Sequence, residues 1–111
     1  MSDVKKFVKD EWWVQVEGDV ARFGISEQLQ EDLGDITFVS LPVVGKTVKK
    51  GEAISELEAE KAVSELASPV NGVILAVNQE AEANPELLNS CKANENWLAD
   101  IKLLSPISEL V

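Results

Sequence analysis

AISELEAEKAVSELA, residues 53–67, contains two runs in which apolar and polar side chains alternate. Alternation with a period of two predicts strands, here at residues 53–58 and 62–67. Only residues 59–61 separate the two runs, so we expect an antiparallel hairpin with Lys61 at its tip. The ISEL of the first run returns as VSEL in the second, as expected if two similar halves meet at this hairpin.

Short β patterns continue on both sides of the hairpin, bounded by glycine, proline and asparagine. Further strands are expected at residues 13–16, 20–23, 36–41, 73–77 and 97–101. Residues 43–51 have a glycine on each side of a Thr-Val-Lys run, which is typical of a looped crossover. The pattern therefore predicts a mostly β fold.

Two short helical segments are expected between the strands. Ser26 suits the N-cap of a helix and Gly34 suits its end, which predicts a helix over residues 27–33. One or two helical turns are expected at residues 84–89, because Pro85 suits the first helical position.

Length and composition favour one globular domain. The chain has 111 residues, 45% of them hydrophobic, so we expect a single domain over residues 1–111 with its core at about 12–104. The single cysteine, Cys91, excludes an intramolecular disulfide and favours a reducing, cytoplasmic setting. No apolar run approaches the roughly 18 residues of a transmembrane helix, and no signal-peptide pattern is present, so we expect no membrane association.

The charge is strongly negative, with 20 acidic residues against 10 basic ones and a net charge of −10. Nucleic acid is therefore not an expected partner, because its phosphates would be repelled. The charge suits partners with electropositive docking faces, and it is equally compatible with a role in solubility alone.

Several residue types that catalysis needs are missing. The sequence has no histidine, so its one cysteine has no imidazole to activate it. Because histidine is the side chain best suited to move protons near neutral pH, we do not expect an enzyme or any catalytic residue. Zinc sites need clusters of cysteine and histidine, so no metal site is predicted either.

Lys61 is the hairpin residue that can carry chemistry. A lysine in a short turn points away from its sheet and can enter a pocket of another protein without unfolding its own domain. Its neighbours are the small Ala62 and the acidic Glu58 and Glu60. Since a lysine ammonium is a poor nucleophile, a modifying enzyme would have to remove its proton. From the residues alone, Lys61 is either an attachment site or an ordinary solvated lysine.

Two segments resemble the lipoyl attachment region of the glycine cleavage H-protein family, EAEKA at residues 58–62 and SPVNGVI at residues 68–74. The resemblance extends along most of the chain through further short segments, at residues 13–21, 24–26, 33–36, 39–42, 85–89 and 97–98. The resemblance implies a lipoyl/biotinyl-type β-sandwich, or flattened hybrid barrel, with short helices and with lipoate on Lys61. The recognition neighbours that it implies are Glu58, Glu60 and Ala62. Biotin carriers share the hairpin but usually have methionines on both sides of the lysine. Here Glu60 and Ala62 flank Lys61, and the one methionine is Met1.

The resemblance also implies a covalent carrier. Lipoylation replaces the lysine charge with an amide and adds a redox-active dithiolane. In glycine cleavage such a carrier accepts an aminomethyl group from glycine decarboxylase and passes it to an aminomethyltransferase, and dihydrolipoyl dehydrogenase then reoxidises it. A lipoate ligase or lipoyl transferase would attach the cofactor. Because a carrier visits several enzymes in turn, we expect a monomer with weak, transient contacts.

Three departures from the family pattern point to a variant role. Asp10-Glu11-Trp12-Trp13 stands where the family typically has Ser or Thr and then His-Glu-Trp, and Glu60 replaces the usual valine before the lysine. The sequence also ends soon after residues 105–110, where typical members continue into a helix. We therefore expect an H-like variant that serves in lipoate relay or in redox regulation linked to ADP-ribosylation, with macrodomain and sirtuin partners. The alternatives are a true glycine cleavage H protein and a non-carrier acidic interaction module. Cys91 is either a redox partner of the arm or an incidental loop cysteine.

Overall fold

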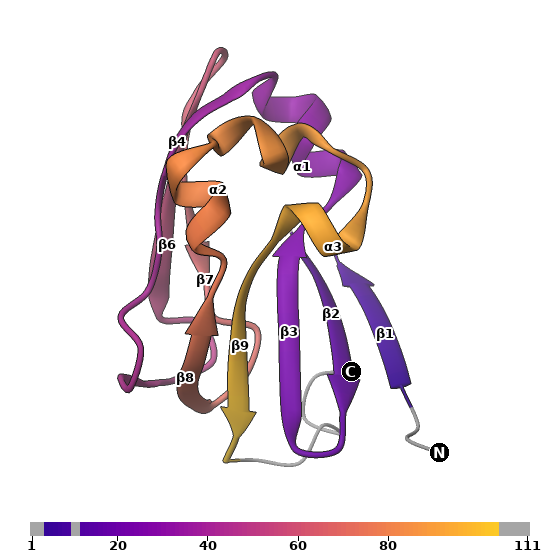
Figure 1. Ribbon diagram of the computed structural model, residues 1–111, viewed down its shortest axis with the longest axis vertical. Helices are drawn as coiled ribbons and strands as arrows, with labels where there is room; N and C mark the ends of the chain where they lie inside the picture. Colours follow the sequence, from indigo (N-terminus) through magenta and orange to yellow (C-terminus); the bar gives the residue numbers. More distant parts are fainter. Residues whose placement is uncertain (1–3, 10–11, 105–111) are drawn as a thin grey trace.

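Two antiparallel sheets form the body of the protein, shown in a computed structural model that describes residues 4–9 and 12–104 (Figure 1). The larger sheet has the order β1-β2-β3-β9-β8-β5 and the smaller has the order β4-β6-β7. The strands of the larger sheet are β1 (Val4–Lys9), β2 (Trp12–Glu17), β3 (Val20–Ile25), β9 (Trp97–Leu103), β8 (Gly72–Val77) and β5 (Thr47–Val48). Those of the smaller sheet are β4 (Ile36–Ser40), β6 (Ala53–Ala59) and β7 (Val63–Ala67).

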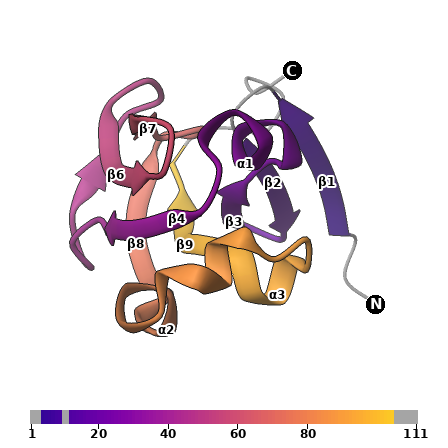
Figure 2. The same ribbon diagram turned by 90° about the horizontal axis from the view of Figure 1, so that it is seen from above.

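Short helices connect the strands. They are α1 (Glu27–Leu33), α2 (Gln79–Ala83), the 3-10 helix η1 (Pro85–Asn89) and α3 (Ala93–Asn96). α1 lies between β3 and β4 in the chain, whereas the other three follow one another between β8 and β9 and run along one side of the molecule (Figure 2). In the part of the chain that the structure describes, no helix is long and apolar enough to cross a membrane.

One apolar core joins the two sheets and α1. The larger sheet contributes Phe23 and Ile101, and the smaller sheet contributes Leu57 and Leu66, all of them fully buried. Helix α1 adds its two buried leucines. Along β6 the burial alternates, with Leu57 facing inward and Glu58 exposed, as expected for a strand with one solvated face. The core therefore fixes which side chains of β6 and β7 face solvent.

The predicted fold class and the main local predictions are confirmed. The hairpin is present as β6 and β7, although β6 continues through Ala59 and β7 begins at Val63. Helix α1 occupies the predicted residues 27–33, and the Leu29 N–H donates to the Oγ of the N-cap residue Ser26 over 3.1 Å. The helix therefore begins and ends where its capping residues predict.

Some elements differ from the sequence-based expectation. β1, β5, α2 and α3 were not predicted, and the helical segment expected at residues 84–89 is a 3-10 helix. The two similar segments, ISEL and VSEL, lie on opposite arms of one hairpin, where Glu56 lies beside Glu65 and Leu57 lies beside Ser64. This repeat therefore does not divide the fold into equivalent halves.

Candidate functional site

Lys61 lies at the tip of the β6–β7 hairpin, in a turn made of residues 60–62, which we call the lysine turn. The Ala59 N–H donates to the Ala62 carbonyl over 3.0 Å and closes the turn. In Figure 1 the tip of this hairpin extends beyond the neighbouring elements. The side chain of Lys61 is exposed. The turn therefore displays an accessible amine at one end of the molecule.

The lysine turn is attached to the end of helix α1. The backbone N–H of Lys61 donates to the Leu33 carbonyl over 2.9 Å, and that of Glu60 donates to the Asp35 carbonyl over 2.9 Å. The Lys61 Nζ donates to the Glu31 carbonyl over 3.2 Å. The last carbonyls of a helix carry partial negative charge, so this is a favourable place for an ammonium group. The turn is thus held by a second element as well as by its own hairpin.

Gly34 lies between the two residues, Leu33 and Asp35, whose carbonyls accept hydrogen bonds from the lysine turn. Its φ of 75° and ψ of −154° lie in a region that essentially only glycine occupies. A Cβ at this position would lie 3.4 Å from the Glu60 Cβ and 3.5 Å from the Lys61 Cγ. These are ordinary contact distances, so it is the backbone conformation at the end of α1, and not a lack of space, that favours glycine here.

The outer face of the smaller sheet carries an exposed row of side chains near the turn. Glu58 is paired with Phe38 on one side and with Val63 on the other. Phe38 is 46% exposed and Val63 is 62% exposed, so both apolar side chains flank the Glu58 carboxylate in solvent. A partner that binds the hairpin from this face would contact one carboxylate between two apolar side chains.

The surroundings of Lys61 are acidic. Residues 23–45, which include α1, contain four acidic residues and no basic one. The hairpin, residues 53–67, contains four glutamates, and Lys61 is its one basic residue. Such a concentration of one sign of charge favours approach of a positively charged partner surface.

The structure places all four predicted site residues on the β6–β7 hairpin. Glu60, Lys61 and Ala62 form the lysine turn, and Glu58 stands exposed on the adjoining part of β6. The α1 carbonyls and Gly34 were not predicted as parts of the site. The bonds to α1 use backbone oxygens, which carry no side-chain signal in the sequence.

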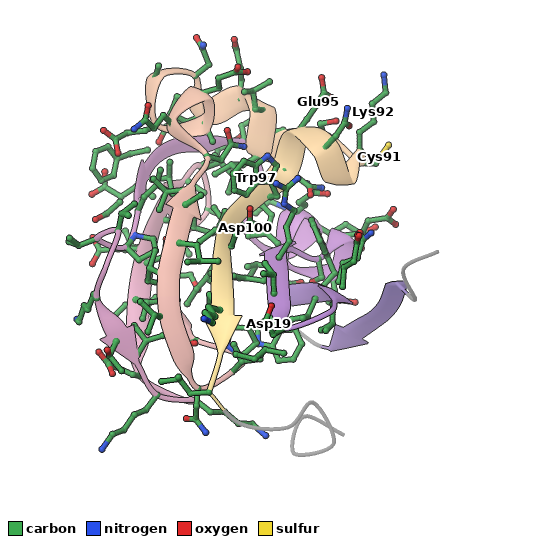
Figure 3. The ribbon with its side chains drawn as sticks, turned by 60° about the horizontal axis from the view of Figure 1, so that its bottom comes forward. Asp19, Cys91, Lys92, Glu95, Trp97 and Asp100 are labelled. Carbon is green, nitrogen blue, oxygen red and sulfur yellow. The ribbon has the colours of Figure 1, made fainter. Side chains whose placement is uncertain are left out.

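A second polar cluster lies on the outer face of the larger sheet, around the labelled Asp100 and Trp97 in Figure 3. The Arg22 guanidinium donates to both Asp100 carboxylate oxygens, over 2.7 and 3.0 Å, and lies 4.1 Å from the Trp97 ring centroid. The hydrogen bonds to Asp100 raise the pKa of Arg22 above its ordinary value. With Gln15 and Val20, the pair borders a groove of about 450 Å³. None of the predicted site residues lines this groove.

Cys91 lies between η1 and α3, where its thiol is exposed and free (Figure 3). Figure 3 shows it pointing outward beside Lys92. No group of His, Cys, Asp and Glu side chains suited to a metal ion occurs within the described ranges 4–9 and 12–104.

The fold and the position of Lys61 define the class of the protein, a lipoyl/biotinyl-type β-sandwich with an exposed lysine at a hairpin tip. The family model described as Glycine cleavage H-protein matches residues 5–110. The chain belongs to the glycine cleavage H-protein family.

Individual relatives agree with this assignment. The glycine cleavage system H protein of Thermotoga maritima is 40% identical over 100 residues, which cover 90% of this chain and 81% of that protein. The H protein of Caulobacter vibrioides is 44% identical over 101 residues, which cover 91% of this chain and 84% of that protein. The crystal structure of a glycine cleavage system H protein from Mycobacterium marinum matches with a TM-score of 0.83 at 33% identity, covering 90% of this chain and 84% of that one.

Proposed function

We propose that this protein is a lipoyl carrier of glycine cleavage, with lipoate joined through an amide bond to the Nζ of Lys61. The observation that carries the proposal is the exposed Lys61 in a short turn that is hydrogen-bonded to α1. Membership of the H-protein family supports the same role. The protein would be a substrate and shuttle for other enzymes and would have no catalytic residue of its own.

The residues of the turn fit covalent attachment. Ala59 and Ala62 are small, so a modifying enzyme can approach the Lys61 amine from either arm of the hairpin. In the attachment step the amine first loses a proton and then attacks the activated carboxyl carbon of lipoate. An amide bond forms as the activating group leaves and the nitrogen gives up a second proton. Glu58, Glu60 and Ala62 are proposed as the neighbours that the modifying enzyme recognises.

The attached group would supply dithiol–disulfide chemistry, and the protein would supply presentation and docking. The partners proposed on this basis are a lipoate ligase or lipoyl transferase, glycine decarboxylase, the aminomethyltransferase and dihydrolipoyl dehydrogenase. The acidic residues of α1 and of the hairpin suit basic docking faces on these enzymes.

The names of the relatives favour glycine cleavage over the variant role that the sequence departures suggested. The relatives described above are named as glycine cleavage system H proteins, although they share only 33–44% of their aligned residues with this chain. No observation on the described residues favours lipoate relay or ADP-ribosylation specifically. The primary proposal is therefore the aminomethyl shuttle.

A mass measurement tests the attachment. The purified protein is incubated with a lipoate ligase, lipoate and ATP, and its intact mass is compared with that of Lys61→Arg. We expect one lipoyl adduct on the wild type and none on Lys61→Arg. Lys49→Arg is the matched control, because Lys49 is also exposed beside a turn, and this variant should still be modified. An adduct that persists in Lys61→Arg would contradict the proposal.

Reconstitution distinguishes the possible roles. Lipoylated protein mixed with the other glycine cleavage components should support glycine decarboxylation. Lipoylated protein that is inactive in that assay but donates lipoate to another apo-protein would favour the relay instead. Partner binding that is unchanged by Lys61→Ala and by lipoate starvation would favour the non-carrier interaction module.

A further inference from the structure

We infer that Gln30 and Asn89 are positioning residues for acylation of Lys61, an inference that rests on the proposed function. The two side chains fix both ends of residues 31–35, the segment whose carbonyl oxygens accept hydrogen bonds from the lysine turn. They act through this segment and not on the amine itself.

The first fixed point is the last turn of α1. The side-chain amide nitrogen of Gln30, Nε2, donates to the Leu88 carbonyl over 2.6 Å and to the Ser90 carbonyl over 2.7 Å. Both donors of one amide group are therefore used. Leu88 is fully buried in the core, so the carbonyls that hold Gln30 belong to a firmly packed segment.

The second fixed point is the start of β4. The Ile36 N–H donates to the side-chain oxygen of Asn89 over 2.8 Å. The pairing of β4 with β6 is irregular between Ile36 and Phe38, and Asn89 supplies an acceptor at that irregularity. Asn89 itself is exposed, so it can be replaced without opening a cavity in the core.

Between these fixed points lie the acceptors of the lysine turn, the carbonyls of Glu31, Leu33 and Asp35. If the segment moved, the turn would move with it, because Lys61 bonds to it through both its backbone N–H and its Nζ. The rate of acyl transfer depends steeply on how well the nucleophile is oriented. Loosening residues 31–35 should therefore slow modification of Lys61 while the fold persists.

The test uses a pair of substitutions at one position. Asn89→Ala removes the acceptor for the Ile36 N–H, whereas Asn89→Asp keeps an oxygen acceptor there. We expect amide hydrogen exchange at Glu60 and Lys61 to rise in Asn89→Ala by about fivefold, the equivalent of one ordinary hydrogen bond. The kcat/KM for enzymatic lipoylation should fall in the same variant. Asn89→Asp should restore both quantities toward the wild-type values.

Helix α1 offers a second variant and a matched control. Gln30→Glu replaces the donating amide with a carboxylate facing two carbonyls, so it should act like Asn89→Ala. Gln28→Ala, on the same helix, removes an exposed hydrogen bond to the Asp32 side chain. The Asp32 carbonyl is not among the acceptors of the lysine turn described above, so this variant should leave both measurements unchanged.

Three results are decisive. The inference would be overturned if amide hydrogen exchange at Glu60 and Lys61 were as slow in Asn89→Ala as in the wild type. An equal rise at the buried strand residue Leu57 would also overturn it, because that would indicate global destabilisation. A wild-type protein that accepts no lipoate would contradict the proposed function instead. The exchange data alone would then decide whether Asn89 and Gln30 hold the lysine turn in place through residues 31–35.

Discussion

A Cβ added to Gly34 would lie 3.4 Å from the Glu60 Cβ, which is an ordinary van der Waals contact distance. The end of α1 and the lysine turn therefore form one packed unit. The exposed amine at the hairpin tip depends on a contact between segments that are separated in the sequence.

Gly34→Ala should lower the free energy of unfolding by about 1–3 kcal/mol, because the backbone conformation of Gly34 is strained for alanine. Relaxation of that strained backbone should shift the neighbouring Leu33 and Asp35 carbonyls and so displace the lysine turn that bonds to them. Gly18→Ala is the matched control, since Gly18 has a φ of 62° but nothing within 4 Å of the added Cβ. Urea unfolding would give the stabilities, and amide exchange at Lys61 would report the displacement. Equal exchange at Lys61 in the two variants would contradict the proposed contact.

Leu57→Ala should destabilise the fold by about 2–5 kcal/mol, because it leaves a cavity under the hairpin where Leu57 is fully buried. Leu75→Ala, at a side chain that is 45% exposed, should cost less than about 1 kcal/mol. The midpoints of urea unfolding measure the difference. Similar costs for the two leucines would mean that β6 does not face the core as described.

The Arg22–Asp100 pair should show a coupling energy of about 1 kcal/mol in a double-mutant cycle with Arg22→Met and Asp100→Asn. The value stays small because the Arg22 side chain is 42% exposed and solvent screens the pair. Added salt should reduce the coupling further. Arg22→Lys should recover only part of it, since an ammonium cannot reproduce the two parallel hydrogen bonds to Asp100. Full recovery in Arg22→Lys would show that the two-point geometry contributes nothing.

Glu52 should make a small pH-dependent contribution to stability. The hydrogen bond from Lys46, followed by that from the Lys49 backbone N–H, lowers the pKa of Glu52 below its ordinary value of about 4.5. A carboxylate with a lowered pKa stabilises the folded state above the pKa of the unfolded chain, and this stabilisation disappears as the pH falls through the folded-state pKa.

The stability difference between the wild type and Glu52→Gln should therefore shrink as the pH is lowered from about 5 to about 3. Urea unfolding at several pH values measures this difference. Lys46→Gln removes the main cause of the lowered pKa, so in that background the effect of Glu52→Gln should depend less on pH. A stability difference between the wild type and Glu52→Gln that grows as the pH is lowered would contradict this prediction.

The elements that the sequence predicts well are those that local rules determine. α1 begins after a side-chain cap and ends at a glycine with positive φ, and both residues are visible in the sequence. The β6–β7 hairpin follows from alternation with a period of two, because the core buries one face of each arm. The sequence alone therefore places Lys61 at the tip of a hairpin.

Other elements depend on tertiary contacts. α3 has four residues and no side-chain cap, and β5 has two residues that are defined by their pairing with β8. The backbone hydrogen bonds from the lysine turn to the end of α1 and to the residue after Gly34 use the carbonyls of Leu33 and Asp35, which any residues at those positions would provide. The Gln30 and Asn89 bonds join residues that are 53 or more positions apart, so no local pattern reveals them.

Three residues separate β6 from β7, and the backbone N–H of Lys61 is hydrogen-bonded to α1. The Cα of Lys61 is therefore held in place. A group attached there would explore space through its own rotatable bonds and those of the lysine, and not through loop motion. Its effective concentration in the pocket of a docked enzyme would then be set by tether length and docking geometry. Lengthening the turn with flexible residues would dilute the tethered group at each pocket it visits.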